Sequence, residues 1–131
     1  GPWLTRDAIT FLEKILTKEM IALEYGCGTS TAWYAQRVKH LTSIEHATGW
    51  ANRVSEYLQS KNTTNVDLKC LRLFDVYFEA VDNMGEFDFI AIDGRRRCEC
   101  VWHAHTHVHI GGYLLMPSLY QRFSSFLANR A

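Results

Sequence analysis

Short apolar runs alternate with amphipathic segments along most of the 131-residue chain, and this alternation limits the fold more than any other feature. The runs have the length of β-strands, and the segments between them carry apolar residues at helical spacing. Strands that alternate with helices form a parallel sheet with right-handed crossovers and two covered faces. The sequence therefore predicts an α/β, doubly wound fold with a mainly parallel five-stranded sheet and helices on both faces.

The expected strands are residues 20–25, 40–45, 66–73, 87–92 and 113–116. Helices are expected after Thr5 and at residues 31–38, 49–58 and 77–81. Residues 97–109 are ambiguous, because residues 102–110 alternate like a strand while Val101, Ala104, His105 and Val108 also share one helical face. Because consecutive parallel strands need a crossover, we predict a helix here that ends at residues 111–112.

Composition indicates a single soluble domain over residues 1–131, with 47% apolar and 21% charged residues. Lys plus Arg and Asp plus Glu both total 14, so no net positive charge attracts nucleic acid. The apolar runs are far shorter than the roughly 20 residues of a membrane-spanning helix. Four cysteines in a chain this apolar are typical of reduced thiols. We therefore expect a cytoplasmic protein that binds neither membrane nor nucleic acid.

Two glycines stand where the first expected strand turns into a helix, in the sequence Gly-Cys-Gly-Thr-Ser-Thr at residues 26–31. Gly26 and Gly28 would let backbone amides approach a ligand closely, although a tight turn alone also explains them. Glu45 ends the second strand, where ribose hydroxyls usually meet a carboxylate in doubly wound folds. An ordinary exposed acid is the alternative for Glu45, and the pairing of the two features favours ligand binding.

Residues 22–31, Ala-Leu-Glu-Tyr-Gly-Cys-Gly-Thr-Ser-Thr, resemble motif I of class I S-adenosylmethionine-dependent methyltransferases, with an acid two residues before the first glycine. Residues 87–94, Phe-Asp-Phe-Ile-Ala-Ile-Asp-Gly, resemble the fourth-strand motif of the same family. The resemblance extends over roughly residues 12–116. It implies a Rossmann-like fold, S-adenosylmethionine as the cofactor and an enzyme that methylates a small-molecule acceptor.

The resemblance implies a role in cofactor binding for five residues. Gly26 and Gly28 would line the methionine part, and Glu24 would help to hold its amino group. Glu45 would bind the ribose, and Asp75 would meet the adenine amino group. The alternative for Asp75 is that it caps a helix.

The resemblance also makes Asp93 the catalytic candidate, since the acid in this position faces the cofactor methyl group and the acceptor. A carboxylate there can accept the proton that the acceptor loses, unless it only caps the next helix. Metal-dependent O-methyltransferases of this family add an Asp-Asn pair after the fifth strand. This chain has Met-Pro-Ser at residues 116–118, so we predict no metal.

Three further patterns have both a functional and a structural interpretation. Arg95, Arg96 and Arg97 suit an anionic group on the acceptor, or form a solvated loop. Four histidines and two cysteines within residues 98–109 invite zinc binding, but on a helix the four histidines point in two directions and cannot all reach one ion, whereas on a strand they would share one face. Cys27 is a thiol at a helix start, where the pKa of a thiol can fall, or simply a small residue between two glycines.

Family members usually continue with antiparallel strands after the fifth, and we expect this chain to lack them. Residues 120–127 then form a short amphipathic helix over the sheet edge, or the edge pairs with a second subunit in a homodimer. A non-catalytic cofactor-binding or protein-interaction module is the main alternative to a methyltransferase. A nicotinamide-dependent oxidoreductase is disfavoured, because Glu24 precedes the glycines and Thr31 replaces the third glycine of the dinucleotide motif.

Overall fold

The computed structural model describes residues 5–73, 76–116 and 127–129, and these residues form one six-stranded sheet. The strands are β1 (Ile21–Tyr25), β2 (His40–Glu45), β3 (Val66–Cys70), β4 (Phe87–Ile92), β5 (Val108–Leu115) and β6 (Leu127–Asn129). Their order is β3-β2-β1-β4-β5-β6, and β1 to β5 are parallel. The predicted five-stranded parallel sheet is therefore confirmed.

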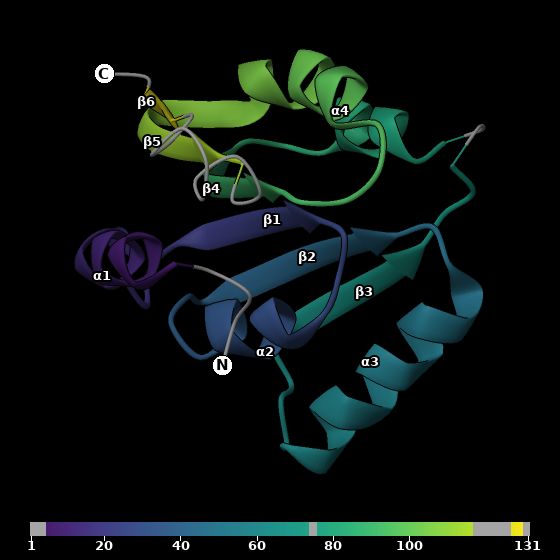
Figure 1. The fold of residues 1–131 in the computed structure, drawn as a ribbon. Helices are drawn as coiled ribbons and strands as arrows, with labels where there is room; N and C mark the ends of the chain where they lie inside the picture. The colour runs from purple at the N-terminus through teal and green to yellow at the C-terminus, as the bar shows by residue number, and fades with distance from the viewer. Residues whose placement is uncertain (1–4, 74–75, 117–126, 130–131) are drawn as a thin grey trace.

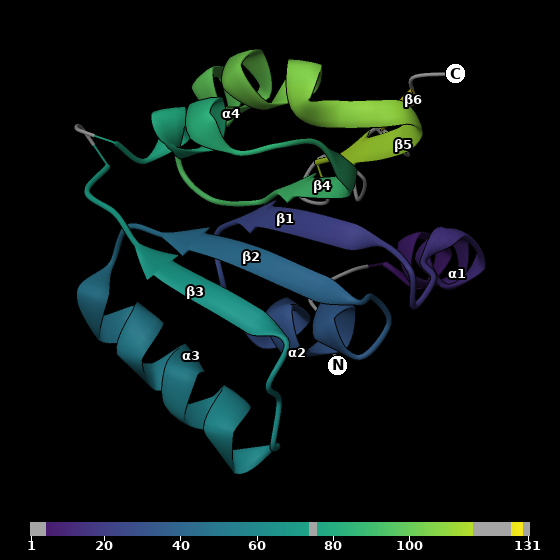
Figure 2. The ribbon, with the colours of Figure 1, turned by 180° about the vertical axis from the view of Figure 1, so that it is seen from behind.

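Helices cover both faces of this sheet (Figures 1 and 2). One face carries α1 (Arg6–Ile15), α2 (Thr29–Ala35) and α3 (Thr48–Ser60). The other carries the 3₁₀ helix η1 (Phe78–Asn83) and α4 (Arg97–Ala104), which continues into the 3₁₀ turn η2 (His105–His107). The chain is therefore a doubly wound α/β fold, as the alternation predicts.

Successive residues of the central strands point to opposite faces, and both faces are buried. Leu23 and Ile90 belong to the core on the α4 side, whereas Ala22 and Phe89 belong to the core under α1 and α2. All four are fully buried. Strands buried on both faces read as continuous apolar runs, which explains why the sequence predicted them well.

The start of the first helix also agrees with the sequence. The Thr5 hydroxyl accepts a hydrogen bond from the Ala8 N–H at 3.1 Å, which caps α1, and Leu12 is buried beneath it. A side-chain cap of this kind typically stabilises a helix by about 1 kcal/mol.

The segment of residues 97–109 was predicted as one helix, and this is wrong for its last two residues. The α-helix ends at Ala104, the 3₁₀ turn η2 continues it to His107, and β5 begins at Val108. Phe87 pairs with Val108 but Phe89 pairs with Tyr113, so the intervening residues of β5 bulge out of the ladder. The sequence pattern was ambiguous because it belongs to a helix and to a strand in turn.

The two glycines predicted to end that helix lie inside β5 instead and make its bulge. Gly111 has a left-handed backbone with φ of +86°. A Cβ on Gly112 would lie 2.6 Å from the Asp88 carbonyl oxygen. These glycines mark an irregular strand rather than a helix end, because only a residue without a side chain fits there.

The expected absence of an antiparallel strand after β5 is also wrong. Strand β6 pairs antiparallel with β5, with Leu115 opposite Leu127 and Tyr113 opposite Asn129. Of the helix expected at residues 120–127, residues 120–126 lie outside the described residues, and Leu127 begins β6. Pairing through a bare edge of β5, the predicted basis of a homodimer, stays a prediction.

None of the described helices has the length and apolar character of a membrane span.

Candidate functional site

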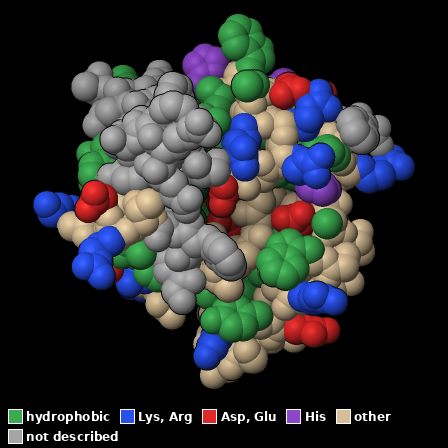
Figure 3. Space-filling model, in the orientation of Figure 1, with side chains coloured by type: hydrophobic (Ala, Val, Ile, Leu, Met, Phe, Trp, Pro, Cys, Tyr) green, Lys and Arg blue, Asp and Glu red, His purple; other side chains and the backbone are tan. Residues whose placement is uncertain are grey.

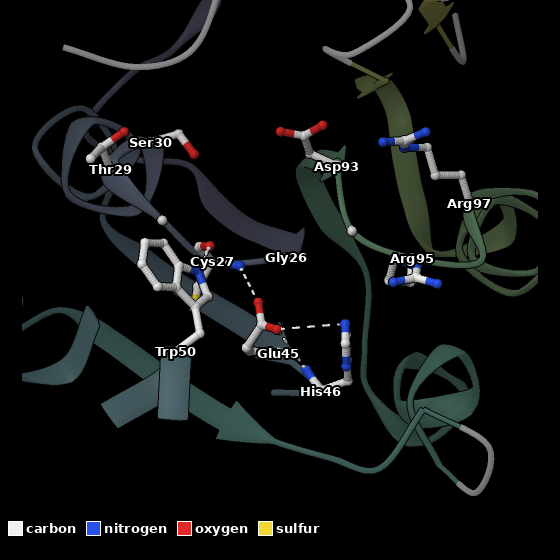
Figure 4. Close-up of a pocket in the computed structure, with 12 residues that line it drawn as sticks. Gly26, Cys27, Thr29, Ser30, Glu45, His46, Trp50, Asp93, Arg95 and Arg97 are labelled. Carbon is white, nitrogen blue, oxygen red and sulfur yellow. Dashed lines mark hydrogen bonds and ion pairs between the residues drawn. The ribbon is translucent and has the colours of Figure 1, made fainter. Parts of the chain in front are cut away.

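A pocket of about 380 Å³ opens at the carboxyl ends of β1, β2 and β4 (Figure 4). After β1 the chain crosses to α2 on one face, and after β4 it crosses to α4 on the other. Diverging connections of this kind leave a crevice at which doubly wound folds bind ligands. The lining residues come from the segments that follow these strands: Gly26, Cys27, Gly28, Thr29, Ser30, Glu45, His46, Trp50, Asp93, Gly94, Arg95 and Arg97. Figure 3 shows the hollowed face, with acidic side chains near its centre and basic ones at its border.

The glycine turn forms one wall of the pocket. Gly26 has φ of +89°, and its N–H donates to the Ile44 carbonyl oxygen at 2.7 Å. The Gly28 N–H donates to the Thr31 hydroxyl at 2.9 Å at the start of α2. A Cβ on Gly28 would meet only Trp50, at an ordinary 3.7 Å. Gly26 is therefore required by the turn itself, whereas Gly28 leaves open space on the pocket side.

Glu45 lines the pocket at the end of β2, with only 5% of its surface exposed. Its Oε1 accepts from the Cys27 N–H at 3.0 Å, and its Oε2 accepts from the N–H groups of His46 at 3.1 Å and Ala47 at 3.0 Å. These bonds fix the carboxylate and tie the end of β2 to the glycine turn (Figure 4). Because each carboxylate oxygen can accept two hydrogen bonds, the group keeps capacity for a ligand.

Glu24 does not line the pocket, although the sequence groups it with the cofactor residues. Its side chain faces α2 and is buried, and its Oε1 accepts from the hydroxyls of Thr31 and of Ser43, the latter at 2.8 Å. Burial raises the pKa of this carboxyl to about 7, against the lowering effect of the two hydroxyls. In this arrangement Glu24 supports the first turn of α2, and contact with a cofactor stays a prediction.

Asp93 follows β4 and reaches the mouth of the pocket, where its side chain is exposed. Its N–H donates to the Tyr25 carbonyl oxygen at 2.9 Å, which holds it beside the end of β1. Partial loss of hydration against the pocket wall raises the pKa of its carboxyl, while the charge of Arg97 acts in the opposite direction. The alternative role as a helix cap does not apply, because α4 is preceded by Arg96. Asp75 lies outside the described residues.

The three consecutive arginines separate into two groups. Arg96 has a left-handed backbone, φ 57° and ψ 49°, and its guanidinium pairs with Glu99. Arg95 and Arg97 line the pocket instead, and neither makes an ion pair with a described residue. A left-handed conformation costs a residue with a side chain about 1–2 kcal/mol. All three arginines are exposed to solvent, and two of them, Arg95 and Arg97, also face the pocket.

Two aromatic side chains of the pocket were missed by sequence reasoning. The Trp50 indole N–H donates to the Cys27 carbonyl oxygen at 2.7 Å, and the ring remains 44% exposed at the pocket wall. His46 lies with its Nε2 3.9 Å from the Glu45 carboxylate, edge-on to Tyr77. Their position in the sequence could have identified them, since both follow the strand that ends at the candidate residue Glu45.

The cysteines and histidines show structural roles. Burial and the nearby carboxylates of Glu45 and Glu24 raise the pKa of the Cys27 thiol well above its usual range, so it is no activated nucleophile. All four cysteines are unpaired. His103 bonds to Asp82 at 2.8 Å, and two of the neighbouring histidines bond to Gly85 and Glu86, both at 2.9 Å. Within the described residues, no three metal-binding side chains cluster around a common point.

Comparison with known proteins identifies the fold. The sequence matches no protein-family model and no curated protein sequence. Among solved structures, an rRNA methylase from Streptococcus thermophilus superposes with a TM-score of 0.71 at 17% identity. Precorrin-6y C5,15-methyltransferase from Geobacter metallireducens gives 0.69 at 15%, and coclaurine N-methyltransferase bound to N-methylheliamine and SAH gives 0.63 at 16%. This chain has the class I methyltransferase fold.

The matched region covers most of this chain but only part of these methyltransferases. It comprises 83%, 88% and 82% of the chain, and 67%, 64% and 33% of the respective neighbours. At such low identity the likeness establishes the methyltransferase fold alone, and function has to be argued from the site.

Proposed function

We propose that this chain binds S-adenosylmethionine and transfers its methyl group to a small-molecule acceptor. The observation that carries the proposal is the buried Glu45 carboxylate, which three backbone N–H groups fix beside the glycine turn. A carboxylate in this place suits a ribose hydroxyl, because Oε1 accepts only one of these three bonds and can accept another.

The rest of the pocket fits the same cofactor. Its volume of about 380 Å³ lies within the range of small-molecule sites. The turn at Gly26 and Gly28 presents backbone instead of side chains, and Trp50 and His46 present aromatic surface next to Glu45. S-adenosylmethionine supplies a methyl group on a sulfonium, an electrophile whose sulfur leaves as a neutral thioether. The SAH bound to coclaurine N-methyltransferase is this thioether product, and that protein shares the fold of this chain.

We further propose that Asp93 assists the chemistry, which is the role that the sequence predicts for it. It stands at the mouth of the pocket, directly after β4. When the acceptor oxygen or nitrogen forms its new bond to carbon it must lose a proton, and the Asp93 carboxylate can accept it. A raised pKa makes this carboxylate a better proton acceptor while it is ionised.

The charge balance of the chain favours a small acceptor over a nucleic acid. Acidic and basic residues are equal in number, and the site itself mixes carboxylates with arginines.

Four unpaired cysteines support a reducing compartment such as the cytoplasm.

The decisive experiment is calorimetric titration of S-adenosylmethionine and SAH into the wild-type chain, Glu45→Ala and Glu45→Gln. Both variants remove charge-assisted hydrogen bonds, so we expect affinity to fall about tenfold or more. Glu56→Gln, an exposed acid on α3, is the matched control and should bind like wild type. Circular dichroism establishes that each variant is folded. A folded wild-type chain that binds neither compound would overturn the proposal and favour a non-catalytic interaction module.

A further inference from the structure

We infer that Arg95 and Arg97 form an oxyanion site in this pocket, which selects a small acceptor carrying a carboxylate or a phosphate. The inference rests on the proposed methyl transfer, because it concerns the acceptor of that reaction. It concerns two guanidinium groups that have no role in the cofactor binding proposed above.

The placement of the two side chains is the first argument. Arg95 and Arg97 both line the pocket, on the wall that lies across from Trp50 (Figure 4). In the same view the Arg97 guanidinium points toward Asp93. An oxyanion held on this wall would bring the rest of the acceptor next to the carboxylate that accepts its proton.

The backbone between them is the second argument. Residues two apart on a regular helix point away from each other, so Arg95 and Arg97 would not normally share a wall. The left-handed conformation of Arg96 breaks the helical path immediately before α4 begins at Arg97. Unfavourable backbone at a residue with a side chain is typical of functional sites, where the surrounding structure maintains it.

The pairing of the charges is the third argument. Arg96 is neutralised by Glu99 and lies near the Phe78 ring, with 5.7 Å from its guanidinium carbon to the ring centroid. Arg95 and Arg97 have no ion-pair partner among the described residues, although Arg97 acts electrostatically on Asp93. Two guanidinium groups facing one pocket match the planar, bidentate geometry of carboxylates and phosphates.

The buried acid of the pocket and the two arginines lie on different walls, whereas Asp93 lies on the arginine side. Glu45 lies on the side of β2 and the glycine turn, where the proposed cofactor brings hydroxyl donors. The two arginines follow β4 on the opposite side. This division favours an anion on the acceptor side.

The test uses benzoate and phenyl phosphate as probes, with benzamide as the neutral counterpart of benzoate. Each is titrated into the full chain saturated with SAH, while the arginine Nε–Hε resonances are followed by NMR. We expect saturable shifts of the Arg95 and Arg97 resonances with one or both anions and none with benzamide. The anion that binds more tightly identifies the carboxylate or the phosphate as the natural group.

Three single variants complete the design. Arg95→Gln and Arg97→Gln should each weaken anion binding about tenfold or more, because each removes a charge-assisted contact. Arg96→Gln, between them in sequence but turned to Glu99, should leave the affinity within about twofold. SAH affinity is measured for every variant.

Five results would overturn the inference. Anion affinity that is unchanged in Arg95→Gln and Arg97→Gln would remove the proposed site, and equal shifts at Arg96 would show general charge screening. A parallel loss of SAH affinity in Arg95→Gln and Arg97→Gln would assign the arginines to the carboxylate of the cofactor itself. Failure of wild type to bind SAH would refute the proposed function together with this inference, whereas SAH binding without an anion response would refute this inference alone.

Discussion

Gly26 and Gly94 pack backbone against backbone, and this contact joins the two loops that form the pocket. A Cβ on Gly26 would lie 2.8 Å from both the Cα and the nitrogen of Gly94. A Cβ on Gly94 would lie 2.0 Å from the buried Tyr77 hydroxyl and 3.2 Å from the Gly26 nitrogen. The loops after β1 and β4 can approach this closely only because neither residue has a side chain.

Substitution of Gly26 by alanine should therefore damage both stability and binding. The left-handed φ and the overlap with Gly94 together predict a loss of about 2 kcal/mol or more in the free energy of unfolding. Urea denaturation measures this loss, and calorimetry with SAH measures the binding. Gly49→Ala is the control, since Gly49 lies in α3 with open space around its Cβ position and alanine favours helix there by up to about 1 kcal/mol. Equal stability of Gly26→Ala and wild type would contradict the packing described above.

Glu24 predicts a pH dependence of stability with a definite sign. Its pKa is about 7 in the folded protein against 4.5 for the free side chain, so between these values the folded state binds more protons than the unfolded state. Stability therefore falls as the pH rises from about 4.5 to about 7, by up to roughly 3 kcal/mol from this group. Glu24→Gln keeps an oxygen that can accept from Thr31 and Ser43 but does not titrate.

Urea denaturation at pH 5 and pH 8 tests this prediction. The difference in stability between the two pH values should be smaller in Glu24→Gln than in wild type, with the gain at pH 8. An identical pH dependence in the two proteins would show that the carboxyl is ionised without penalty where it lies.

The carboxyl of Asp93 should titrate above the usual range for aspartate, and Arg97 should limit the shift. Loss of hydration raises its pKa and the guanidinium opposes this, so Arg97→Gln should move the titration to higher pH. The ¹³Cγ chemical shift of Asp93, followed against pH by NMR, reports it directly. Arg96→Gln should leave the curve in place, because that guanidinium pairs with Glu99. A downward movement in Arg97→Gln would contradict the electrostatic relationship.

The cysteines should separate into two classes of reactivity. Cys70 and Cys98 are exposed, whereas Cys27 and Cys100 are buried, and burial raises the pKa of both buried thiols, that of Cys100 to about 12. A thiol reagent at pH 8 should modify two groups rapidly in the folded chain and all four in denaturant. Rapid modification of Cys27 in the folded chain, located by peptide mass spectrometry, would reopen its interpretation as an activated thiol.

Several parts of this protein follow from the sequence alone. The central strands are buried on both faces, so their apolar runs were visible without any knowledge of the sheet. The cap at Thr5 and the turn at Gly26 use local chemistry that the side chains, or their absence, already show. The resemblance in residues 22–31 and 87–94 indicated the fold because each motif is a continuous segment, which can be recognised without knowledge of the tertiary structure.

Other features depended on contacts between distant segments. Glu24 and Glu45 both stand at strand ends, but strand register places Glu24 opposite Ser43, beneath α2, and leaves Glu45 in the pocket. The helix predicted for residues 97–109 ends at His107 instead, because Val108 pairs with Phe87 of β4 and begins β5.

The positions of the central strands along the chain were thus determined by the sequence, through local patterns of burial. The tertiary structure decided which of the acids and arginines meet. At a strand end, the direction of a side chain depends on the register of the strand, and a shift by one residue turns the side chain to the other face. Beside a left-handed residue such as Arg96, the direction depends on that residue's backbone angles, which contacts with other segments maintain.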